Sequence, residues 1–175
     1  AGDYPKFIEE KQEVLTLGIA INNCLVKNNE KKWKMKKGNM ARLQAYFAYE
    51  SMEANKDVAI QINSKEAAAA YERGKEYYYT QRGYLKLSCA SCHIQGAGQR
   101  VRNEKLSQLL GQTTHFPVFR LKWSGLGTLE RRMVGCIKDE GQVPPSAESK
   151  YMKELLYFMS YMSNGMKIDG PDIRK

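Results

Sequence analysis

One pentapeptide constrains this chain more than any other feature of its sequence: Cys89-Ala90-Ser91-Cys92-His93. The spacing C-x-x-C-H is the attachment sequence for c-type haem. On a tight helical turn, two thiols three positions apart can both reach the vinyl groups of a haem. The adjacent histidine can then bind the iron as proximal ligand. The motif therefore predicts one covalently attached haem c and a fold that wraps around it.

The same two cysteines could instead form a thioredoxin-like redox pair or half of a zinc site, or occur by chance. A redox motif follows a strand and opens a longer helix, and a zinc site needs a second Cys/His pair. His115 is the only other histidine, so no second pair exists and covalent haem is favoured. Haem c is attached outside the bacterial cytoplasm. We therefore expect a periplasmic protein, and a mature chain because the sequence has no signal peptide.

Charge and hydropathy exclude several classes of protein. The 175 residues include 28 Lys and Arg against 19 Asp and Glu, a net charge of +9. This excess favours an anionic substrate or an acidic partner. No stretch approaches the ~18 apolar residues that a membrane span needs, so none is expected. Eleven Tyr, five Phe and two Trp are more aromatic surface than a disordered chain has.

Hydrophobic periodicity predicts a mainly α fold, and analogy with other chains that have the C-x-x-C-H motif suggests the cytochrome c type. A helix is expected over Ser64 to Thr80, with Ser64 as N-cap. A second is expected over Lys150 to Met162. Gly74 would let these two helices cross closely, as in small cytochrome c domains, an argument from fold analogy. The glycine-rich segment Gln95 to Gly127 predicts loops around a cofactor, with one short helix near Glu104 to Leu109.

The chain resembles itself at a shift of 112 positions. Tyr4-Pro5-Lys6-Phe7 then aligns with Phe116-Pro117-Val118-Phe119, and Cys24 aligns with Cys136. We interpret this as an ancient duplication. It predicts a degenerate cytochrome c-like half-domain without C-x-x-C-H at 1–60, and a cytochrome c-like haem domain at 61–175. The counterpart of the haem motif would fall before Ala1, and 54–63 would be a linker.

Several further motifs follow one another in an order that resembles one family. They are Arg82-Gly83-Tyr84-Leu85 before the pentapeptide, then Gly98-Gln99-Arg100-Val101-Arg102, Leu106-Ser107-Gln108, Phe116-Pro117-Val118-Phe119-Arg120, Arg131-Arg132-Met133-Val134-Gly135-Cys136 and Ile173-Arg174-Lys175. The chain resembles SoxA, the c-type cytochrome subunit of the Sox thiosulfate-oxidising system. The resemblance is dense from about Gly74 to Lys175 and thinner from Tyr4 to Met52.

The resemblance implies an enzyme, an L-cysteine S-thiosulfotransferase subunit. It implies that Cys89, Cys92 and His93 hold the catalytic haem, and that Cys136 is the other iron ligand, in a persulfide form. Arg132 matches an arginine beside that sulfur. The family joins thiosulfate oxidatively to a cysteine of a carrier protein, SoxYZ, and a small cytochrome, SoxX, accepts electrons in a heterodimer with SoxA.

The chain departs from the family pattern in two places. After the ligand cysteine the family has an arginine-containing stretch, and this chain has Gly141-Gln142-Val143-Pro144. A basic contact is missing there unless Lys138 replaces it. Many members also have a second haem or a disulfide near the N-terminus. Cys24 has no spare cysteine to pair with, so we expect it to be a leftover thiol or bonded outside this chain.

Each candidate residue also has a simpler interpretation. Cys136 alone would be an ordinary buried cysteine, and Met133 is the rival iron ligand. Arg131, Arg132 and Lys138 predict a lowered pKa for the Cys136 thiol, and Arg132 can bind a sulfonate-like group with two hydrogen bonds. Arg100 and Arg102 are candidates for the haem propionates.

A basic run surrounds Trp33 and has two interpretations. It is most simply a solvated loop, and docking of an acidic carrier is the functional alternative; nucleic acid is not expected. Its lysines are Lys27, Lys31, Lys32, Lys34, Lys36 and Lys37. Two alternative functions for the whole chain remain, a non-catalytic electron-transfer cytochrome c and a thiosulfate dehydrogenase that forms tetrathionate.

Overall fold

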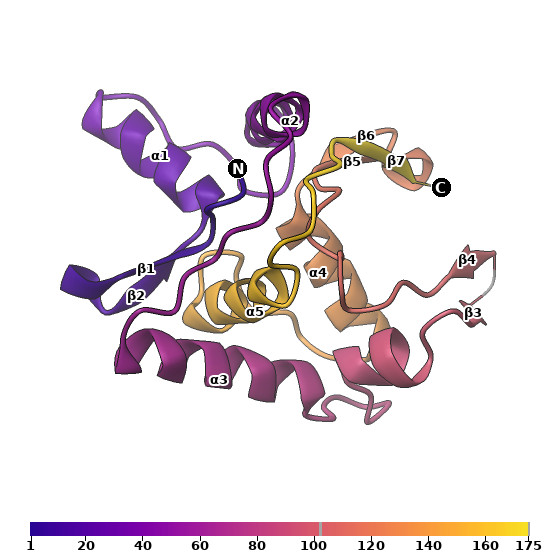
Figure 1. Cartoon of the computed structure of the whole chain (residues 1–175). Coiled ribbons are helices and arrows are strands. Elements are labelled where there is room, and N and C mark those ends of the chain that lie inside the picture. The colour runs from indigo at the N-terminus through magenta and orange to yellow at the C-terminus, as the bar shows by residue number, and fades with distance from the viewer. Residues whose placement is uncertain (102, 175) are drawn as a thin grey trace.

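Helices dominate the structure, a computed structural model that describes residues 1–101 and 103–174 (Figure 1). This confirms the expected mainly α fold. The α-helices are α1 (Leu17–Lys27), α2 (Asn39–Glu53), α3 (Lys65–Tyr79), α4 (Leu129–Asp139) and α5 (Lys150–Tyr161). Short turns of helix are η1 (Glu9–Lys11), η2 (Ser91–Gln95) and η3 (Leu121–Trp123).

The strands are short and form three small sheets. They are β1 (Lys6–Ile8), β2 (Glu13–Leu15), β3 (Arg100–Val101), β4 (Glu104–Lys105), β5 (Val118–Arg120), β6 (Gly125–Gly127) and β7 (Asp172–Arg174). Strands β1 and β2 pair antiparallel, as do β3 and β4. The third sheet has the order β6-β5-β7, and β7 runs parallel to β5.

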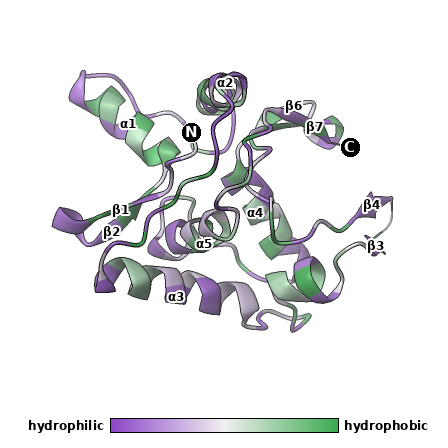
Figure 2. Cartoon of the chain, in the orientation of Figure 1, coloured by the Kyte–Doolittle hydropathy of each residue, from purple (hydrophilic) through white to green (hydrophobic). Residues whose placement is uncertain are grey.

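The two predicted helices are confirmed as α3 and α5, and they lie side by side (Figure 1). Ser64 caps α3, because its hydroxyl accepts a hydrogen bond from the backbone N–H of Ala67. Figure 2 shows both hydrophilic and hydrophobic residues along α3, as expected of a helix with one face in the core. A Cβ at Gly74 would lie 2.1 Å from the carbonyl oxygen of Glu154. The expected close crossing at Gly74 is therefore confirmed.

Helix α5 supplies residues to two hydrophobic clusters, which explains why it is buried on nearly every side. One cluster joins it to α3 and α4 through Leu155, Phe158 and Met159. The other joins Tyr157 to Val14, Val58 and Ile60. The segment 54–63, expected as a linker, is thus partly buried: Val58 and Ile60 are 6% and 2% exposed.

The secondary-structure elements themselves repeat at the 112-residue shift. The order β1, η1, β2, α1 recurs as β5, η3, β6, α4 with the same residue offset at every boundary. Gln12 and Ser124, equivalent under this shift, both have left-handed backbone angles, with φ of 50° and 48°. This is the relation that a duplicated unit would show.

The prediction of a short helix near Glu104 to Leu109 is wrong. Glu104 and Lys105 form strand β4, which pairs with β3, and no helix occurs between residues 103 and 109. Pairing of these residues with Arg100 and Val101 outweighs the helix preference of a few residues, because short helices depend on packing for stability. Elsewhere in Gln95 to Gly127, the described residues form loops, the strands β3, β5 and β6, and the short turn η3.

Candidate haem site

One cavity of about 780 Å³ brings together most of the predicted site residues. Cys89 and His93 line it from the C-x-x-C-H turn, and Arg132, Met133 and Cys136 line it from α4. These segments lie about forty residues apart in the sequence. The fold therefore places the histidine and the distant cysteine on the walls of one space.

The C-x-x-C-H segment is folded as a tight helical turn. Ser88 and Ser91 lock its beginning: each backbone N–H donates to the hydroxyl of the other serine over 3.2 Å. Residues Ser91–Gln95 then form a π-helical turn, a conformation often found at functional sites. Cys89 is buried, and Cys92 is partly exposed and does not belong to the lining.

His93 is held through one of its two ring nitrogens. Nδ1 lies 2.8 Å from the carbonyl oxygen of Ser107, an acceptor only, so Nδ1 bears the hydrogen and donates it. This leaves Nε2 unprotonated and available as a metal ligand. Burial lowers the pKa of His93, which favours the neutral ring that binds metal ions.

Helix α4 presents its two functional side chains on one face. Arg132 and Cys136 are four residues apart, which is about one helical turn. Met133, also on α4, lines the same cavity and is 5% exposed. Both the predicted ligand and its methionine rival therefore face the cavity.

The predicted lowering of the Cys136 pKa is wrong. Burial raises the pKa of this thiol, and the opposing effect of Arg132 is smaller. Arg131 points elsewhere, with its guanidinium 4.3 Å from the ring of Trp123. Lys138 is exposed and outside the cavity lining. The sequence shows the nearby positive charges, whereas the low polarity of the site depends on the whole fold.

Burial likewise raises the pKa of Cys89 and of Cys92. None of the four cysteines forms a disulfide within the chain.

Arg132 shares an acidic partner with a second, buried arginine. Oε2 of Glu104 lies 4.0 Å from a guanidinium nitrogen of Arg132, and Oε1 forms an ion pair with Arg120. Arg120 is 5% exposed and also lines the cavity, as does Arg174. Sequence patterns do not identify Arg120 and Glu104 as site residues. Arg120 lies on β5 and Glu104 on β4, and only the folded chain brings the two together at the cavity wall.

The remaining lining suits a haem. Tyr78, Leu129 and Met159 belong to the apolar part of the lining, and Arg100, Lys105 and Arg174 belong to its charged part. An amphiphilic macrocycle with apolar vinyl edges and anionic propionates matches this division of polarity. The described residues contain no group of three or more His, Cys, Asp or Glu side chains that could hold a bare metal ion.

Other candidates have different positions. Arg100 lines the cavity, and Arg102 lies outside the described residues. Gly141 has a positive φ of 78°, and its carbonyl accepts a hydrogen bond from the N–H of Tyr84. The glycine in place of the family's motif thus serves a tight backbone contact. Cys24 is exposed on α1.

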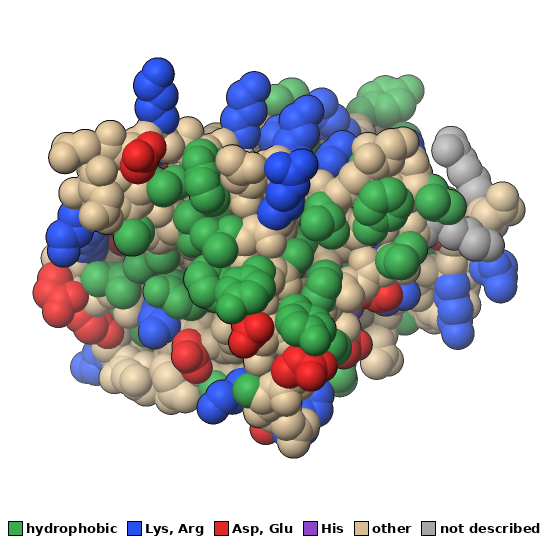
Figure 3. Space-filling model, turned by 90° about the horizontal axis from the view of Figure 1, so that it is seen from above, with side chains coloured by type: hydrophobic (Ala, Val, Ile, Leu, Met, Phe, Trp, Pro, Cys, Tyr) green, Lys and Arg blue, Asp and Glu red, His purple; other side chains and the backbone are tan. Residues whose placement is uncertain are grey.

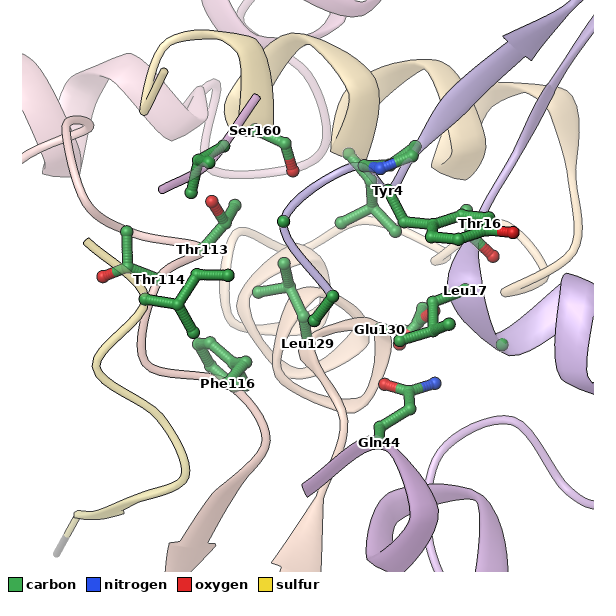
Figure 4. A pocket seen from close by; sticks show the side chains of 17 residues that line it. Tyr4, Thr16, Leu17, Gln44, Thr113, Thr114, Phe116, Leu129, Glu130 and Ser160 are labelled. Carbon is green, nitrogen blue, oxygen red and sulfur yellow. The ribbon is translucent and has the colours of Figure 1, made fainter. Parts of the chain in front are cut away.

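A second cavity, of about 110 Å³, contains none of the predicted site residues (Figure 4). It lies where the N-terminal segment and α2 meet α4 and α5. Glu130 and Gln44 extend toward it, and the amide Nε2 of Gln44 is buried without a hydrogen-bond partner. The lining mixes these polar groups with apolar residues such as Leu17 and Leu156, and it contains neither cysteine nor arginine.

No helix in the described part of the chain is both long and apolar enough to cross a membrane. A mainly helical fold around a cavity lined by a C-x-x-C-H turn defines a cytochrome c domain. Comparison with known proteins agrees: the family model for the SoxA/TsdA cytochrome c domain matches residues 1–55 and 73–168. The chain belongs to this family.

Individual relatives point to one branch of the family. The chain is 47% identical over 174 residues to the L-cysteine S-thiosulfotransferase subunit SoxA of Chlorobaculum thiosulfatiphilum. It is 40% identical over 172 residues to the SoxA subunit of Allochromatium vinosum. These matches cover 99% and 98% of this chain but only 60% and 61% of the relatives.

A solved structure shows the same fold. The chain superposes on a chain of the crystal structure of SoxXA from P. pantotrophus with a TM-score of 0.89 and 32% sequence identity. The match covers 99% of this chain and 64% of that one. The cytochrome c fold thus extends over the described length of the chain, and the relatives are longer.

Proposed function

We propose that this chain holds the catalytic haem of a thiosulfate-conjugating enzyme. One haem c would be attached through Cys89 and Cys92, and His93 and the sulfur of Cys136 would bind its iron. The observation that supports this best is the cavity itself, where His93 and Cys136 face one space from two separate segments. The similarity to L-cysteine S-thiosulfotransferase subunits supports the reaction class.

The reaction joins two sulfur atoms and releases electrons. The thiol of an acidic carrier protein, of the SoxYZ kind, loses its proton, and its sulfur bonds to the terminal sulfur of thiosulfate. Two electrons leave as this S–S bond forms. Bound haem supplies a one-electron acceptor, so a partner cytochrome of the SoxX kind is needed for the second electron.

The chain's own residues bind and orient the anion. The Arg132 guanidinium can hold two sulfonate oxygens of thiosulfate, which places the terminal sulfur near Cys136, one helical turn away. We propose that Cys136 takes part as a persulfide. In the structure the carboxylate of Glu104 contacts the guanidinium of Arg132. Thiosulfate would replace Glu104 in this contact.

Localisation and docking follow from the same chemistry. We propose a periplasmic protein, since covalent haem attachment occurs outside the cytoplasm. The exposed lysines at 27–37 would guide an acidic carrier by long-range attraction. Association should then weaken as salt shortens the screening length to about 10 Å at 0.1 M.

Replacing Cys136 tests the proposal. Cys136→Ala should keep haem attached through Cys89 and Cys92, change the axial ligation, and abolish thiosulfate conjugation. Cys136→Met should raise the reduction potential, because a neutral thioether replaces an anionic sulfur. A native spectrum and full activity in Cys136→Ala would instead identify a packed cysteine, with Met133 as ligand of an electron-transfer cytochrome. Tetrathionate as the product of the unmodified protein would indicate a thiosulfate dehydrogenase.

Adjacent arginines provide a matched pair for the anion-binding role. Arg132→Ala should raise the KM for thiosulfate by tenfold or more, equal to about 1.4 kcal/mol. Arg131→Ala should leave it nearly unchanged, since Arg131 contacts Trp123. Equal effects in the two variants would contradict a specific role for Arg132.

A further inference from the structure

Four side chains from three segments form a continuous row of hydrogen bonds along the wall of the large cavity. The Tyr78 hydroxyl on α3 donates to Oε1 of Gln112 over 3.0 Å. Nε2 of Gln112 donates to Oγ of Ser107 over 3.3 Å. The same Oγ lies 3.3 Å from Nδ1 of His93, in addition to the 2.8 Å contact of Nδ1 with the serine carbonyl. All four residues line the cavity.

The inner half of this row is buried. Tyr78 is 0% exposed and Gln112 is 8% exposed. Buried polar groups lower stability unless they are hydrogen-bonded, and a phenylalanine would fill the space of Tyr78 equally well. A tyrosine and a glutamine that satisfy each other in an otherwise apolar wall therefore suggest a role beyond packing.

The donors and acceptors fix one direction for the whole row. In this orientation of the Gln112 amide, Oε1 accepts the hydrogen bond of the Tyr78 hydroxyl, and Nε2 donates a hydrogen bond to Oγ of Ser107. Reversing the amide would leave the Tyr78 proton buried without an acceptor. In the described orientation, Oγ of Ser107 accepts a hydrogen bond from Nε2 of Gln112 and has a lone pair left to accept from Nδ1–H of His93.

We propose that Tyr78 and Gln112 are positioning residues for His93. They hold the Ser107 hydroxyl in place as a second acceptor for Nδ1–H, beside the Ser107 carbonyl. Both contacts fix the tautomer and the orientation of the imidazole ring, so that Nε2 remains free to bind iron. Acceptors on the far nitrogen of a ligating histidine make it a stronger donor, which stabilises ferric iron and lowers the reduction potential. The inference rests on the proposed role of His93 as proximal ligand.

The test is the midpoint potential of the purified, haem-loaded protein and three variants. Gln112→Leu keeps the side-chain volume, Tyr78→Phe removes only the hydroxyl, and Ser107→Ala changes an exposed residue that folding tolerates. Each should raise the potential. For Gln112→Leu we expect the equilibrium between ferric and ferrous haem to shift about tenfold toward the ferrous state. For a one-electron couple this shift raises the potential by about 59 mV.

A double variant separates a connected row from independent contacts. Because Tyr78 acts through Gln112, Tyr78→Phe combined with Gln112→Leu should shift the potential no further than Gln112→Leu alone. The matched control is Tyr157→Phe, which removes another buried hydroxyl, bonded to the Gln61 carbonyl, and should not shift the potential.

Two outcomes would overturn the inference: unchanged potentials in Tyr78→Phe and Ser107→Ala at full haem content, or an additive double variant. The proposed role of His93 has its own readout, the hyperfine-shifted Nδ1–H resonance of a ligated histidine in the unmodified ferric protein. Its absence would overturn that role before any variant is compared.

Discussion

Gly74 lies against the backbone of Glu154, so close that a Cβ would stand 2.1 Å from the Glu154 carbonyl oxygen and 3.0 Å from the Cβ of Phe158. The obstructing atoms are mostly backbone and cannot rotate away. The neighbouring side chains reinforce this crossing, because Arg73 forms three hydrogen bonds with the Glu154 carboxylate. The crossing of α3 and α5 therefore depends on the absence of a side chain at this position.

We predict that Gly74→Ala destabilises the protein by about 1–3 kcal/mol, because the helices must move apart. The expected helix-propensity gain of about 1 kcal/mol is too small to compensate. Chemical denaturation of the haem-loaded protein measures the change. Gly135→Ala is the control, since a Cβ there meets only a side-chain nitrogen at 4.0 Å; that variant should be at least as stable as the unmodified protein.

Aromatic residues at equivalent positions of α2 and α5 should differ in their contribution to stability. Phe158 is 1% exposed and its ring centre lies 5.3 Å from those of Tyr71 and Tyr78. Its counterpart 112 residues earlier, Tyr46, is 55% exposed. Figure 3 shows hydrophobic side chains gathered on the face that lies uppermost in Figure 1, where α2 is found.

We predict that Phe158→Ala lowers the free energy of unfolding by about 3–5 kcal/mol. Tyr46→Ala should change it by no more than about 0.5 kcal/mol. Denaturation curves of the two variants provide the comparison. A large loss in Tyr46→Ala would show that the exposed face of α2 contributes to the fold of this chain in solution.

Residues 1–60 contain the elements β1, η1, β2 and α1 in the same order as β5, η3, β6 and α4 later in the chain. We propose that residues 1–60 are a degenerate cytochrome c-like half-domain joined to a haem domain at 61–175. The shared element boundaries support this proposal. So does the equivalence of Cys24 on α1 with Cys136 on α4. The cluster that joins Val14 to Tyr157 shows that the two parts pack together tightly.

Cys24 should then have no part in haem binding. It is exposed on α1 and its sulfur contacts only the Asn28 amide, at 3.8 Å, among the hydrogen bonds of the described residues. We predict that Cys24→Ser keeps haem content and the Soret band unchanged, as measured by absorption and intact mass. Loss of haem would contradict this, and would mean that the N-terminal cysteine reaches the cofactor.

The sequence predicts best what depends on neighbours along the chain. The cap at Ser64, the crossing glycine and the C-x-x-C-H turn are all local patterns, and the structure has each in its expected element. The helix expected at Glu104 is wrong because the strand there depends on pairing with β3. The row from Tyr78 to Ser107 could not be predicted, because it joins α3 to a loop about thirty residues later. The raised pKa of Cys136 depends on burial, which no run of neighbouring arginines reveals.

Glu130 is a buried acid outside the haem cavity. It lies at the start of α4, is 4% exposed, and extends toward the small cavity together with Gln44 (Figure 4). Burial raises its pKa, and contacts with Thr128 and the helix backbone offset only part of this effect. An ionised carboxylate here lacks most of its hydration, so it should lower the stability of the folded chain.

The sign of the pH dependence follows from the raised pKa. Above the folded pKa, Glu130 is ionised in both states and the folded chain bears the full desolvation cost. As the pH falls through the folded pKa, the folded state binds a proton first, so stability rises until the unfolded value near 4.5 is reached.

We predict that Glu130→Gln, neutral at every pH, is more stable than the unmodified protein at about pH 8. The expected gain is about 1.4 kcal/mol for every tenfold difference in proton affinity between the folded and unfolded states. It should disappear toward about pH 4, where the carboxyl is protonated in both states. Urea denaturation across this range measures it, with the exposed Glu50→Gln as control. Parallel stability curves for Glu130→Gln and the unmodified protein would show that Glu130 does not titrate between these limits.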